Sequence, residues 1–373
     1  MRRFIFFFTF FFFLVMGIAA AQDVPRIQFS HSTESLRGVS TVSRQVAWAS
    51  GTHGTYLRTV DGGRTWTPAQ VPDAGTLDFR AVVAFSADEA FLMSAGPGDQ
   101  SRIYYTSDGG KHWLLQFTNT NPKGFFDSMV FWDSKHGVVV GDPVPDESGK
   151  LTFELLMTDD GQNWRILPPA QLPVALEGEG AFAASNTCLA IVPGGSDSNL
   201  WFATGGKAAR VFHSGDRGEH WEVFDTPMIH GSDSTGIFSI AFRDPRHGVI
   251  AGGDYKKTND DGPNLAFTED GGKTWTLSPL HPLAYFSAVV YDRHVNDAAI
   301  RQGMSQKQQR IKPIPPERIF IVGQDFVFDF RPPINPHRIN GKKKMKLQFH
   351  AASAYPEGGV LIVGAKGTMA YIP

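Results

Sequence analysis

One eight-residue pattern recurs five times in this chain of 373 residues and restricts its folding more than any other feature. The consensus is Ser/Thr-x-Asp-x-Gly-x-x-Trp. Its acid and indole positions are Asp61 and Trp66, Asp108 and Trp113, Asp159 and Trp164, Asp216 and Trp221, and Asp270 and Trp275. Only the third copy departs, with Met157 at the hydroxyl position, and successive Trp residues are 47, 51, 57 and 54 positions apart. Such regular spacing indicates a repeat architecture.

The pattern is that of the Asp box and has the chemistry of a hairpin turn. The Asp carboxylate accepts hydrogen bonds from backbone N–H groups of the turn. The Gly supports a positive φ, and the Trp lays a large apolar face over the adjoining strand or blade. Because five equivalent copies cannot all form one active site, we expect structural and not catalytic roles for the five Asp residues.

Short strands are expected around each box, and no segment has a convincing helical period. Expected second strands include 45–51, 137–142, 201–206 and 248–254, and expected inner strands are 79–85, 125–131, 181–185 and 238–242. Four strands in about 50 residues is the arithmetic of a β-propeller blade. Two further units without a box are expected at 286–323 and 348–364.

The last of these units leaves no room for an outer strand after Tyr371. Residues 26–29 are expected to supply that strand, which closes the ring with the two termini and removes exposed edges. The prediction is therefore an all-β, seven-bladed propeller that forms a single domain over residues 22–373, with six or eight blades as alternatives.

The N-terminal residues have the pattern of a signal peptide. Arg2 and Arg3 precede an apolar run over 4–16, and 19–21 offer a small-residue cleavage site. The run is shorter than the roughly 20 residues of a membrane span, although an uncleaved anchor is the alternative. We therefore expect cleavage after residue 21 and export to the periplasm or the extracellular space. The single cysteine, Cys188, has an apolar context typical of a buried thiol.

Residues 293–346 carry twelve Lys and Arg against four Asp and Glu, although the whole chain has a net charge of −2. We expect a solvated basic insertion in the degenerate sixth blade, with an acidic surface partner as the alternative. Nucleic acid, the usual interpretation of a basic run, is not expected for an exported protein.

Ligands of propellers bind at the central funnel, so the candidate site residues are charged groups at inner-strand starts and at glycine turns after second strands. They are Arg37, Arg80, Asp127, Asp142, Glu179, Asp254 and His350. Charges of both signs would suit a polar ligand or a peptide terminus. Equally, these side chains could pair with one another and close the channel.

The boxes resemble the bacterial neuraminidase (BNR) repeat of sialidase-like propellers. Six phrases more closely resemble exported bacterial propellers similar to photosystem II stability/assembly factors: 77–80, 125–127, 141–143, 178–185, 236–239 and 252–255. The likeness covers nearly the whole mature chain, with 293–346 as the departure. It implies box turns at the rim away from the binding mouth, and an assembly scaffold with no reaction of its own.

We therefore expect a monomeric scaffold that binds a protein or peptide through its funnel, with carbohydrate as a second ligand class. The alternative is a glycoside hydrolase, which needs two carboxyls flanking one bond. Asp127, Asp142, Glu179 and Asp254 could supply that pair, but the chain lacks the Phe/Tyr-Arg-Ile-Pro motif of sialidases. A redox enzyme is less favoured, because no Gly-x-Gly-x-x-Gly follows a strand and no haem motif is present. We expect no cofactor and no metal.

Overall fold

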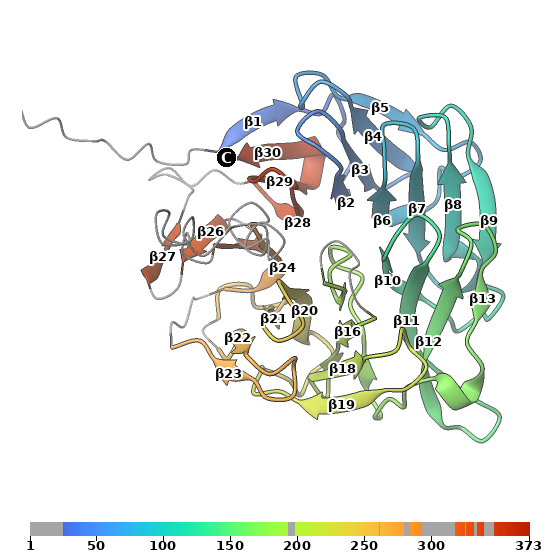
Figure 1. Ribbon diagram of the computed structural model, residues 1–373, viewed down its shortest axis with the longest axis vertical. Coiled ribbons are helices and arrows are strands. Elements are labelled where there is room, and N and C mark those ends of the chain that lie inside the picture. The colour runs from blue at the N-terminus through green and yellow to red at the C-terminus, as the bar shows by residue number, and fades with distance from the viewer. Residues whose placement is uncertain are drawn as a thin grey trace, which may run out of the picture.

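The computed structural model describes residues 25–192, 198–260, 262–279, 284–292, 318–324, 326–331, 334–338 and 347–373. These residues form β-strands and three short 3₁₀ helices, with no α-helix among them. Seven antiparallel sheets surround a central axis (Figure 1), which confirms the predicted seven-bladed propeller. Within the described residues, no helix has the length and apolar character needed to cross a bilayer. The predicted signal peptide, residues 1–21, lies outside the described residues.

Blades 1 to 3 are regular four-stranded sheets. Blade 1 contains β2 (Leu36–Thr41), β3 (Ala47–Gly51), β4 (Thr55–Thr59) and β5 (Thr67–Gln70). Blade 2 contains β6 (Asp78–Ala84), β7 (Ala90–Ala95), β8 (Arg102–Thr106) and β9 (Leu114–Thr118). Blade 3 contains β10 (Phe126–Phe131), β11 (Gly137–Pro145), β12 (Leu151–Thr158) and β13 (Arg165–Ile166).

Blades 4 and 5 are less regular. Blade 4 contains β15 (Leu189–Ala190), β16 (Leu200–Ala203), β18 (Arg210–Ser214) and β19 (Glu222–Asp225). Blade 5 contains β20 (Thr235–Phe242), β21 (Gly248–Asp254), β22 (Leu265–Thr268) and β23 (Thr276–Leu277). Two short strands, β14 (Glu179–Gly180) and β17 (Gly205–Gly206), extend the sheet of blade 5 beyond β20. The chain between blades 3 and 4 therefore contributes a strand, β14, to the sheet of blade 5 before blade 4 begins.

Blade 6 contains β24 (Phe286–Tyr291), β25 (Ile319–Gly323), β26 (Phe326–Arg331) and β27 (Ile334–Arg338). The predicted basic insertion at 293–346 is thus not one continuous loop, because β25, β26 and β27 fall inside it. Its remaining residues, apart from a few that flank these strands, lie outside the described part of the chain.

Blade 7 closes the ring. It contains β28 (Phe349–Ala354), β29 (Val360–Gly364) and β30 (Thr368–Ile372), and its outer strand is β1 (Arg26–Phe29). Arg26 pairs with Tyr371 and Phe29 with Thr368, so the predicted closure by the two terminal strands is confirmed. Trp66 Nε1 donates a 2.9 Å hydrogen bond to Gln28 Oε1 on β1. Trp164 of blade 3 makes the same 2.9 Å bond to Gln116 on the outer strand of blade 2.

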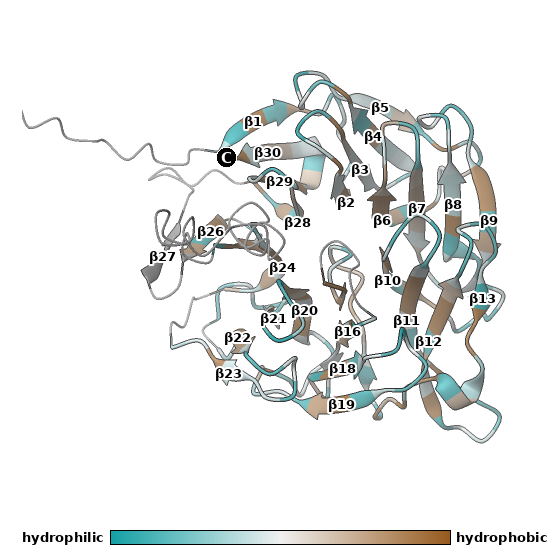
Figure 2. Ribbon diagram, in the orientation of Figure 1, coloured by the Kyte–Doolittle hydropathy of each residue, from teal (hydrophilic) through white to brown (hydrophobic). Residues whose placement is uncertain are grey.

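Consecutive blades pack on one another through seven apolar clusters, one at each junction around the ring. Between blades 1 and 2, for example, Trp48 and Tyr56 meet Phe79 and Leu92. A fully buried side chain of this size contributes about 1.5–3 kcal/mol. Figure 2 shows this apolar character along β6, β10 and β11 and more hydrophilic residues in many of the turns. The ring is therefore held by sheet-to-sheet packing.

Each octad turn, meaning the turn that carries one copy of the repeated pattern, is capped by its Asp. In blade 1, Asp61 accepts hydrogen bonds from Thr59 Oγ1, from Thr65 N–H and from Thr65 Oγ1 at 2.5–2.9 Å. These bonds, chiefly those from Thr65, lower the pKa of Asp61 to about 2. Gly63 follows with φ of 77° and donates to Thr59 Oγ1. The expected roles of the acid and the glycine therefore agree with the geometry.

The third octad turn corrects one prediction. Thr158, and not Met157, holds the hydroxyl position, because Gly161 N–H donates to Thr158 Oγ1. The capping acid is Asp160, which accepts from Thr158 Oγ1 and from Asn163 N–H. Asp159, the residue assigned from the sequence, is instead exposed beside Arg165. This turn is one residue shorter between the hydroxyl and Trp164 than the other four.

Candidate functional site

Six inner strands share one irregularity near their starts, and it places side chains around the channel. The register with the second strand shifts between Leu36 and Gly38, and at the equivalent place in β6, β10, β20, β24 and β28. A bulge of this kind re-aims the extra residue. The extra residues are Arg37, Arg80, Asp127, Phe238, Ser287 and His350. Four of the seven residues selected from the sequence therefore occupy one structural position in four blades.

The face where inner strands begin, here called the start face, is opposite the octad turns. Thr41 at the end of β2 pairs with Ala47, which pairs with Thr59 at the start of the first octad turn. The octad turns therefore lie on the end face, where inner strands end. This arrangement is the one that the family resemblance implied, with box turns away from the funnel mouth that carries the charged residues.

Arg37 and Arg80 bring two guanidinium groups together at the start-face mouth. Arg80 Nε donates to Asp78 Oδ2 at 2.6 Å, and Arg80 Nη1 donates to the Ala183 carbonyl at 2.6 Å. Burial and then the neighbouring Arg80 charge lower the pKa of Arg37. Its Nε is buried and has no hydrogen-bond partner among the described residues. A buried donor without a hydrogen-bond partner destabilises the fold, so an acceptor placed at Arg37 Nε would be stabilising.

Two carboxyls, one buried and one partly buried, lie in the same region. Asp127 is 1% exposed, and its Oδ2 has no hydrogen-bond partner within the described residues. Burial, and next the charge of Asp142, raise the pKa of Asp127 well above its ordinary value. Burial raises the pKa of Asp142 to about 6. Asp127 accepts a hydrogen bond from Ala183 N–H, and Asp142 Oδ1 accepts one from Ala181 N–H at 3.1 Å.

Residues 181–188, here called the channel segment, cross the funnel. The prediction of an inner strand over 181–185 was wrong, because these residues form no strand. Asn186 exchanges two hydrogen bonds with Met129 on β10, and Ser185 Oγ donates to the Ser287 carbonyl on β24 at 2.6 Å. The Thr187 carbonyl accepts from Ile240 N–H on β20. Phe182 stacks on Phe238 with ring centroids 3.9 Å apart. The segment therefore touches four other blades when Arg80 is included, and only 189–190 remain as inner strand.

Glu179 is not a funnel ligand. Its side chain is 0% exposed and makes a two-pronged ion pair with Arg210, in which Nε donates to Oε1 at 2.9 Å and Nη2 to Oε2 at 2.5 Å. Thr204 Oγ1 and Leu176 N–H donate to the same carboxylate. Every oxygen of this group is occupied, and the partner, Arg210, is not one of the seven residues selected from the sequence.

His350 and Asp254 complete the selected set. The His350 Nδ1 atom lies 3.0 Å from the Leu36 carbonyl, and burial followed by the Arg37 charge lowers the pKa of His350 to about 4. This imidazole is therefore neutral at neutral pH and donates to that carbonyl. Asp254 ends β21 and caps a turn by accepting from Lys256 N–H. It is bound locally and does not join the central group.

The end face has its own hollow over the channel. A cavity of about 450 Å³ is lined mainly by the ends of the inner strands, with Phe85, Val130 and Val290 among the apolar residues. Asn186 and Thr187 of the channel segment also line it. The same segment contacts Arg80 near the start face. It therefore separates the charged start-face mouth from the apolar cavity on the end face. Cys188, 0% exposed, lies in this segment, and burial raises the pKa of its thiol.

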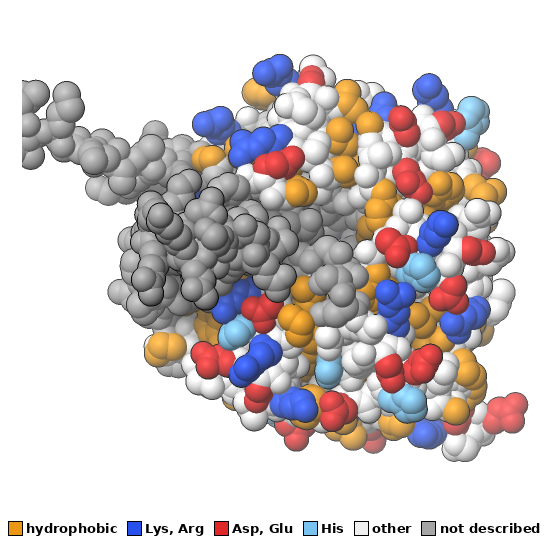
Figure 3. Space-filling view, viewed as in Figure 1, with side chains coloured by type: hydrophobic (Ala, Val, Ile, Leu, Met, Phe, Trp, Pro, Cys, Tyr) orange, Lys and Arg blue, Asp and Glu red, His pale blue; other side chains and the backbone are white. Residues whose placement is uncertain are grey.

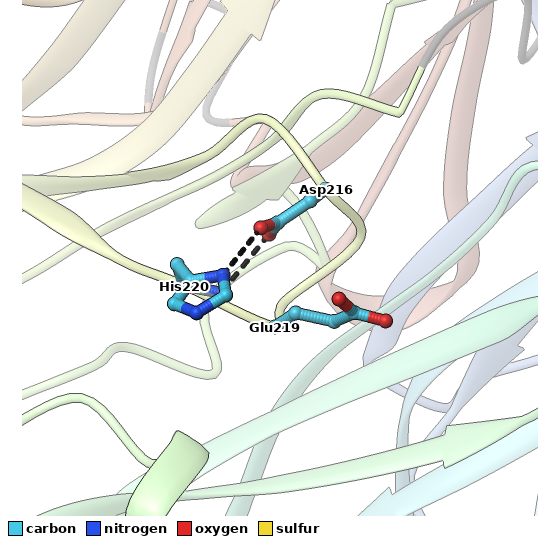
Figure 4. Close-up of side chains that lie close together, drawn as sticks. All are labelled: Asp216, Glu219 and His220. Carbon is cyan, nitrogen blue, oxygen red and sulfur yellow. Dashed lines mark hydrogen bonds and ion pairs between the residues drawn. The ribbon is translucent and has the colours of Figure 1, made fainter.

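Among the described residues, one group of acid and imidazole side chains has the composition of a metal site. Ligand atoms of Asp216, Glu219 and His220 lie within 4.8 Å of one another. Figure 4 shows His220 directed at Asp216, whereas Glu219 points elsewhere. His220 N–H and Nδ1 bond to Asp216, as His112 does to Asp108 in blade 2. The contact is therefore the ordinary cap of an octad turn.

Sequence reasoning missed four residues of the start-face region. Phe238 and Ser287 would have been found by aligning the six inner strands at their bulges, because they hold the bulge position. Asp78 precedes the bulge of β6, and Tyr285, whose pKa burial raises, lies beside Arg37. No sequence pattern identified Arg210, the partner of Glu179. It lies in an irregular blade, where an alignment of the repeats does not predict the direction of its side chain.

Comparisons with known proteins also indicate a likeness to photosystem II stability/assembly factors. No protein-family model matches the chain. It is 25% identical over 298 residues to the photosystem II assembly protein Ycf48 of Thermosynechococcus vestitus, a match that covers 65% of this chain and 72% of that protein. It is 35% identical over 66 residues to the chloroplastic photosystem II stability/assembly factor HCF136 of Arabidopsis thaliana, or 17% of this chain and 15% of that protein.

Among solved structures, the chain is similar to Ycf48 bound to a D1 peptide, with a TM-score of 0.62, 15% identity and coverage of 93% of this chain and 96% of that one. Streptogramin B lyase matches with a TM-score of 0.59 at 11% identity, covering 93% and 96%. Both likenesses concern the propeller fold. The chain is therefore a β-propeller that resembles the photosystem II stability/assembly factors, as its sequence phrases predicted.

Proposed function

We propose that this chain is an exported, non-catalytic scaffold that binds a protein or peptide partner at the start face. The observation that carries this proposal is the pair of guanidinium groups at that mouth, with Arg37 Nε buried and unbonded. A carboxylate of a partner would satisfy this donor, because guanidinium and carboxylate groups form charge-assisted, often two-pronged hydrogen bonds. The partner group would thus be an acidic side chain or a chain terminus.

Three finer statements belong to the same proposal. Residues 1–21 act as a signal peptide, so that residues 22–373 fold as one domain in the periplasm or extracellular space. The octad turns are Asp boxes of the BNR type, since their Ser or Thr, Asp and Gly make the same contacts in four blades. The protein acts as a monomer, because β1 pairs with β30 and the ring closes within one chain.

The relatives support a protein partner. The similar Ycf48 of Thermosynechococcus vestitus is a photosystem II assembly protein, and one of the similar solved structures is a Ycf48 bound to a D1 peptide. The geometry gives less support to a glycoside hydrolase. Glu179 is fully paired, Asp254 caps a turn, and the backbone of Ala181 and Ala183 covers Asp142 and Asp127. Of the four carboxyls selected from the sequence, no two flank an open cleft, which the hydrolysis of a glycosidic bond requires.

Partner capture tests the proposal. Wild-type protein, Arg37→Gln and Arg80→Gln would each be used to recover partners from the exported fraction, and a labelled D1 peptide would serve as a defined probe in fluorescence anisotropy. We expect each substitution to weaken binding about tenfold or more, the usual effect of losing a hydrogen bond between charged groups.

Arg165→Gln provides the matched control, because Arg165 is a half-exposed arginine on β13 that pairs only with exposed Asp159. It should bind like the wild type. Equal recovery of every partner, and equal peptide affinity, by all four proteins would remove the start face from consideration as the binding surface. Circular dichroism would check that each variant remains folded.

A further inference from the structure

A second pocket lies where blade 7 meets blade 1, far from the proposed partner site. It has a volume of about 350 Å³, within the range of small-molecule sites. Its lining residues are Arg26, Gln28, Arg44, Gln45, Asp61, Gly62, Arg64, Tyr355 and Tyr371. We call it the seam pocket. Because it includes the first octad turn, it opens toward the end face and not toward Arg37 and Arg80.

The pocket follows from the way the ring closes. Blade 7 takes its outer strand from the N-terminal β1, so no octad turn joins its third and fourth strands. Arg26 and Gln28 of β1 stand beside Tyr371 of β30 in place of such a turn. The opposite wall is the octad turn of blade 1, which contributes Asp61 and Arg64. The seam thus differs from every junction at which an octad turn is present in both blades.

The floor of the pocket is held firmly. Tyr355 is 3% exposed and contacts Tyr371 edge-to-face, with ring centroids 5.7 Å apart. Gln28 is fixed by the hydrogen bond from Trp66. Arg44 is anchored to the neighbouring turn, because its Nη2 donates to the Glu357 carbonyl at 2.8 Å. A floor that is already ordered spares a ligand much of the cost of immobilising its site.

Three arginines line the pocket without carboxylate partners among the described residues. Across the described residues, Arg26, Arg44 and Arg64 take part in no ion pair, although most other described arginines do. The one acid in the lining, Asp61, is already bonded to Thr59 and Thr65. Figure 3 shows basic side chains gathered beside β1 at this edge of the molecule. The lining therefore carries a formal charge of +2 from three guanidinium groups and one carboxylate.

We propose that the seam pocket binds a phosphate monoester, held by Arg26, Arg44 and Arg64 at the junction of blades 7 and 1. A monoester carries close to two negative charges at neutral pH, which matches the charge of the lining. Guanidinium groups bind phosphate oxygens with two parallel hydrogen bonds. The two amides and the two phenols of the lining are suited to the polar remainder of a small ligand. A soluble monoester and the headgroup of phosphatidic acid share this chemistry.

Calorimetric titration with inorganic phosphate tests the proposal. The double variant Arg26→Gln/Arg64→Gln removes two exposed side chains that have no ion-pair partner, so the fold should persist. We expect the dissociation constant to rise at least about tenfold in this variant, as is usual when hydrogen bonds between charged groups are lost. Lys111→Gln is the matched control, because Lys111 holds the same octad position as Arg64 in blade 2. It should bind phosphate like the wild type.

Two further arms separate the sources and the alternatives. Sedimentation with vesicles of phosphatidylcholine containing phosphatidic acid, compared with phosphatidylcholine alone, assigns the ligand to a lipid if only the first bind and the double variant does not. Binding of soluble phosphate without vesicle binding assigns it to a soluble monoester. Succinate that binds as tightly as phosphate, equal phosphate affinity of the wild type and the double variant, or no binding of either phosphate form would overturn the proposal.

Discussion

The ion pair between Glu179 and Arg210 offers the sharpest test of structural against ligand-binding roles in this propeller. The two side chains are 0% and 11% exposed, and the carboxylate accepts four hydrogen bonds from Arg210, Thr204 and Leu176. Glu179→Gln removes the negative charge and leaves a buried guanidinium uncompensated. Removing one partner of a buried ion pair lowers the free energy of unfolding by about 3–5 kcal/mol.

This loss should be visible as a change in melting temperature. For a chain of about 350 folded residues, the unfolding entropy is roughly 0.7 kcal/mol/K, so the expected decrease is about 4–7 °C. Differential scanning calorimetry would measure it. Arg210→Met combined with Glu179→Gln should recover much of the loss, because replacing both charges is far less costly than stranding one. Glu222→Gln, an exposed acid on β19 of the same blade, should change little.

A structural role for Glu179 would be contradicted if Glu179→Gln melts at the same temperature as the wild type and instead loses its partner in the capture assay. Glu179 would then be a funnel ligand, as its place in the sequence first suggested. A double variant that loses as much stability as the two single variants added together would also contradict a direct pair, because coupled residues do not behave additively.

Three further outcomes are expected. Burial raises the pKa of Asp142 to about 6 above an unfolded value near 3.9, so its stabilising effect is complete below about pH 4 and is lost as the pH rises through 6. Between pH 5 and 8, the free energy of unfolding measured with urea should fall by about 1 kcal/mol less in Asp142→Asn than in the wild type. Asp160→Ala should lower the melting temperature, whereas Asp159→Ala should leave it unchanged, and the reverse order would refute the revised turn. Cys188, fully buried, should react with a thiol reagent only after denaturation, so fast labelling of the native protein would contradict its position.

The blade architecture was predictable because the octads are local. Each turn is built from contacts within seven residues, such as Thr59 with Gly63 and Asp61 with Thr65, so the spacing alone identifies it. The same locality produced the one error among the turns. Two consecutive acids precede Gly161, and the hydrogen bonds from Thr158 Oγ1 and Asn163 N–H show that Asp160 is the cap.

The funnel was predictable only in part, because its contacts join distant segments. Arg37, Arg80, Asp127 and His350 could be selected as charged or titratable residues at strand starts. The channel segment could not, since Ala181-Phe-Ala-Ala-Ser has the apolar character of a strand. Its backbone amides are bound instead by carboxyls of blade 3, and its carbonyl at Ala183 by Arg80 of blade 2. Such competition for the backbone depends on tertiary structure.

The pairing of Arg26–Phe29 with Thr368–Ile372 also sets a condition on how the chain can fold. The partners are separated by nearly the entire described sequence, so this strand pairing has the highest sequence separation among the described strands. Closing so long a loop in an otherwise unfolded chain would cost about 5 kcal/mol in entropy. Blades that have already stacked bring the two strands near one another and remove most of that cost. We therefore expect the pairing of β1 with β30 to be the final step of folding, so that β1 stays unpaired while the rest of the chain is synthesised.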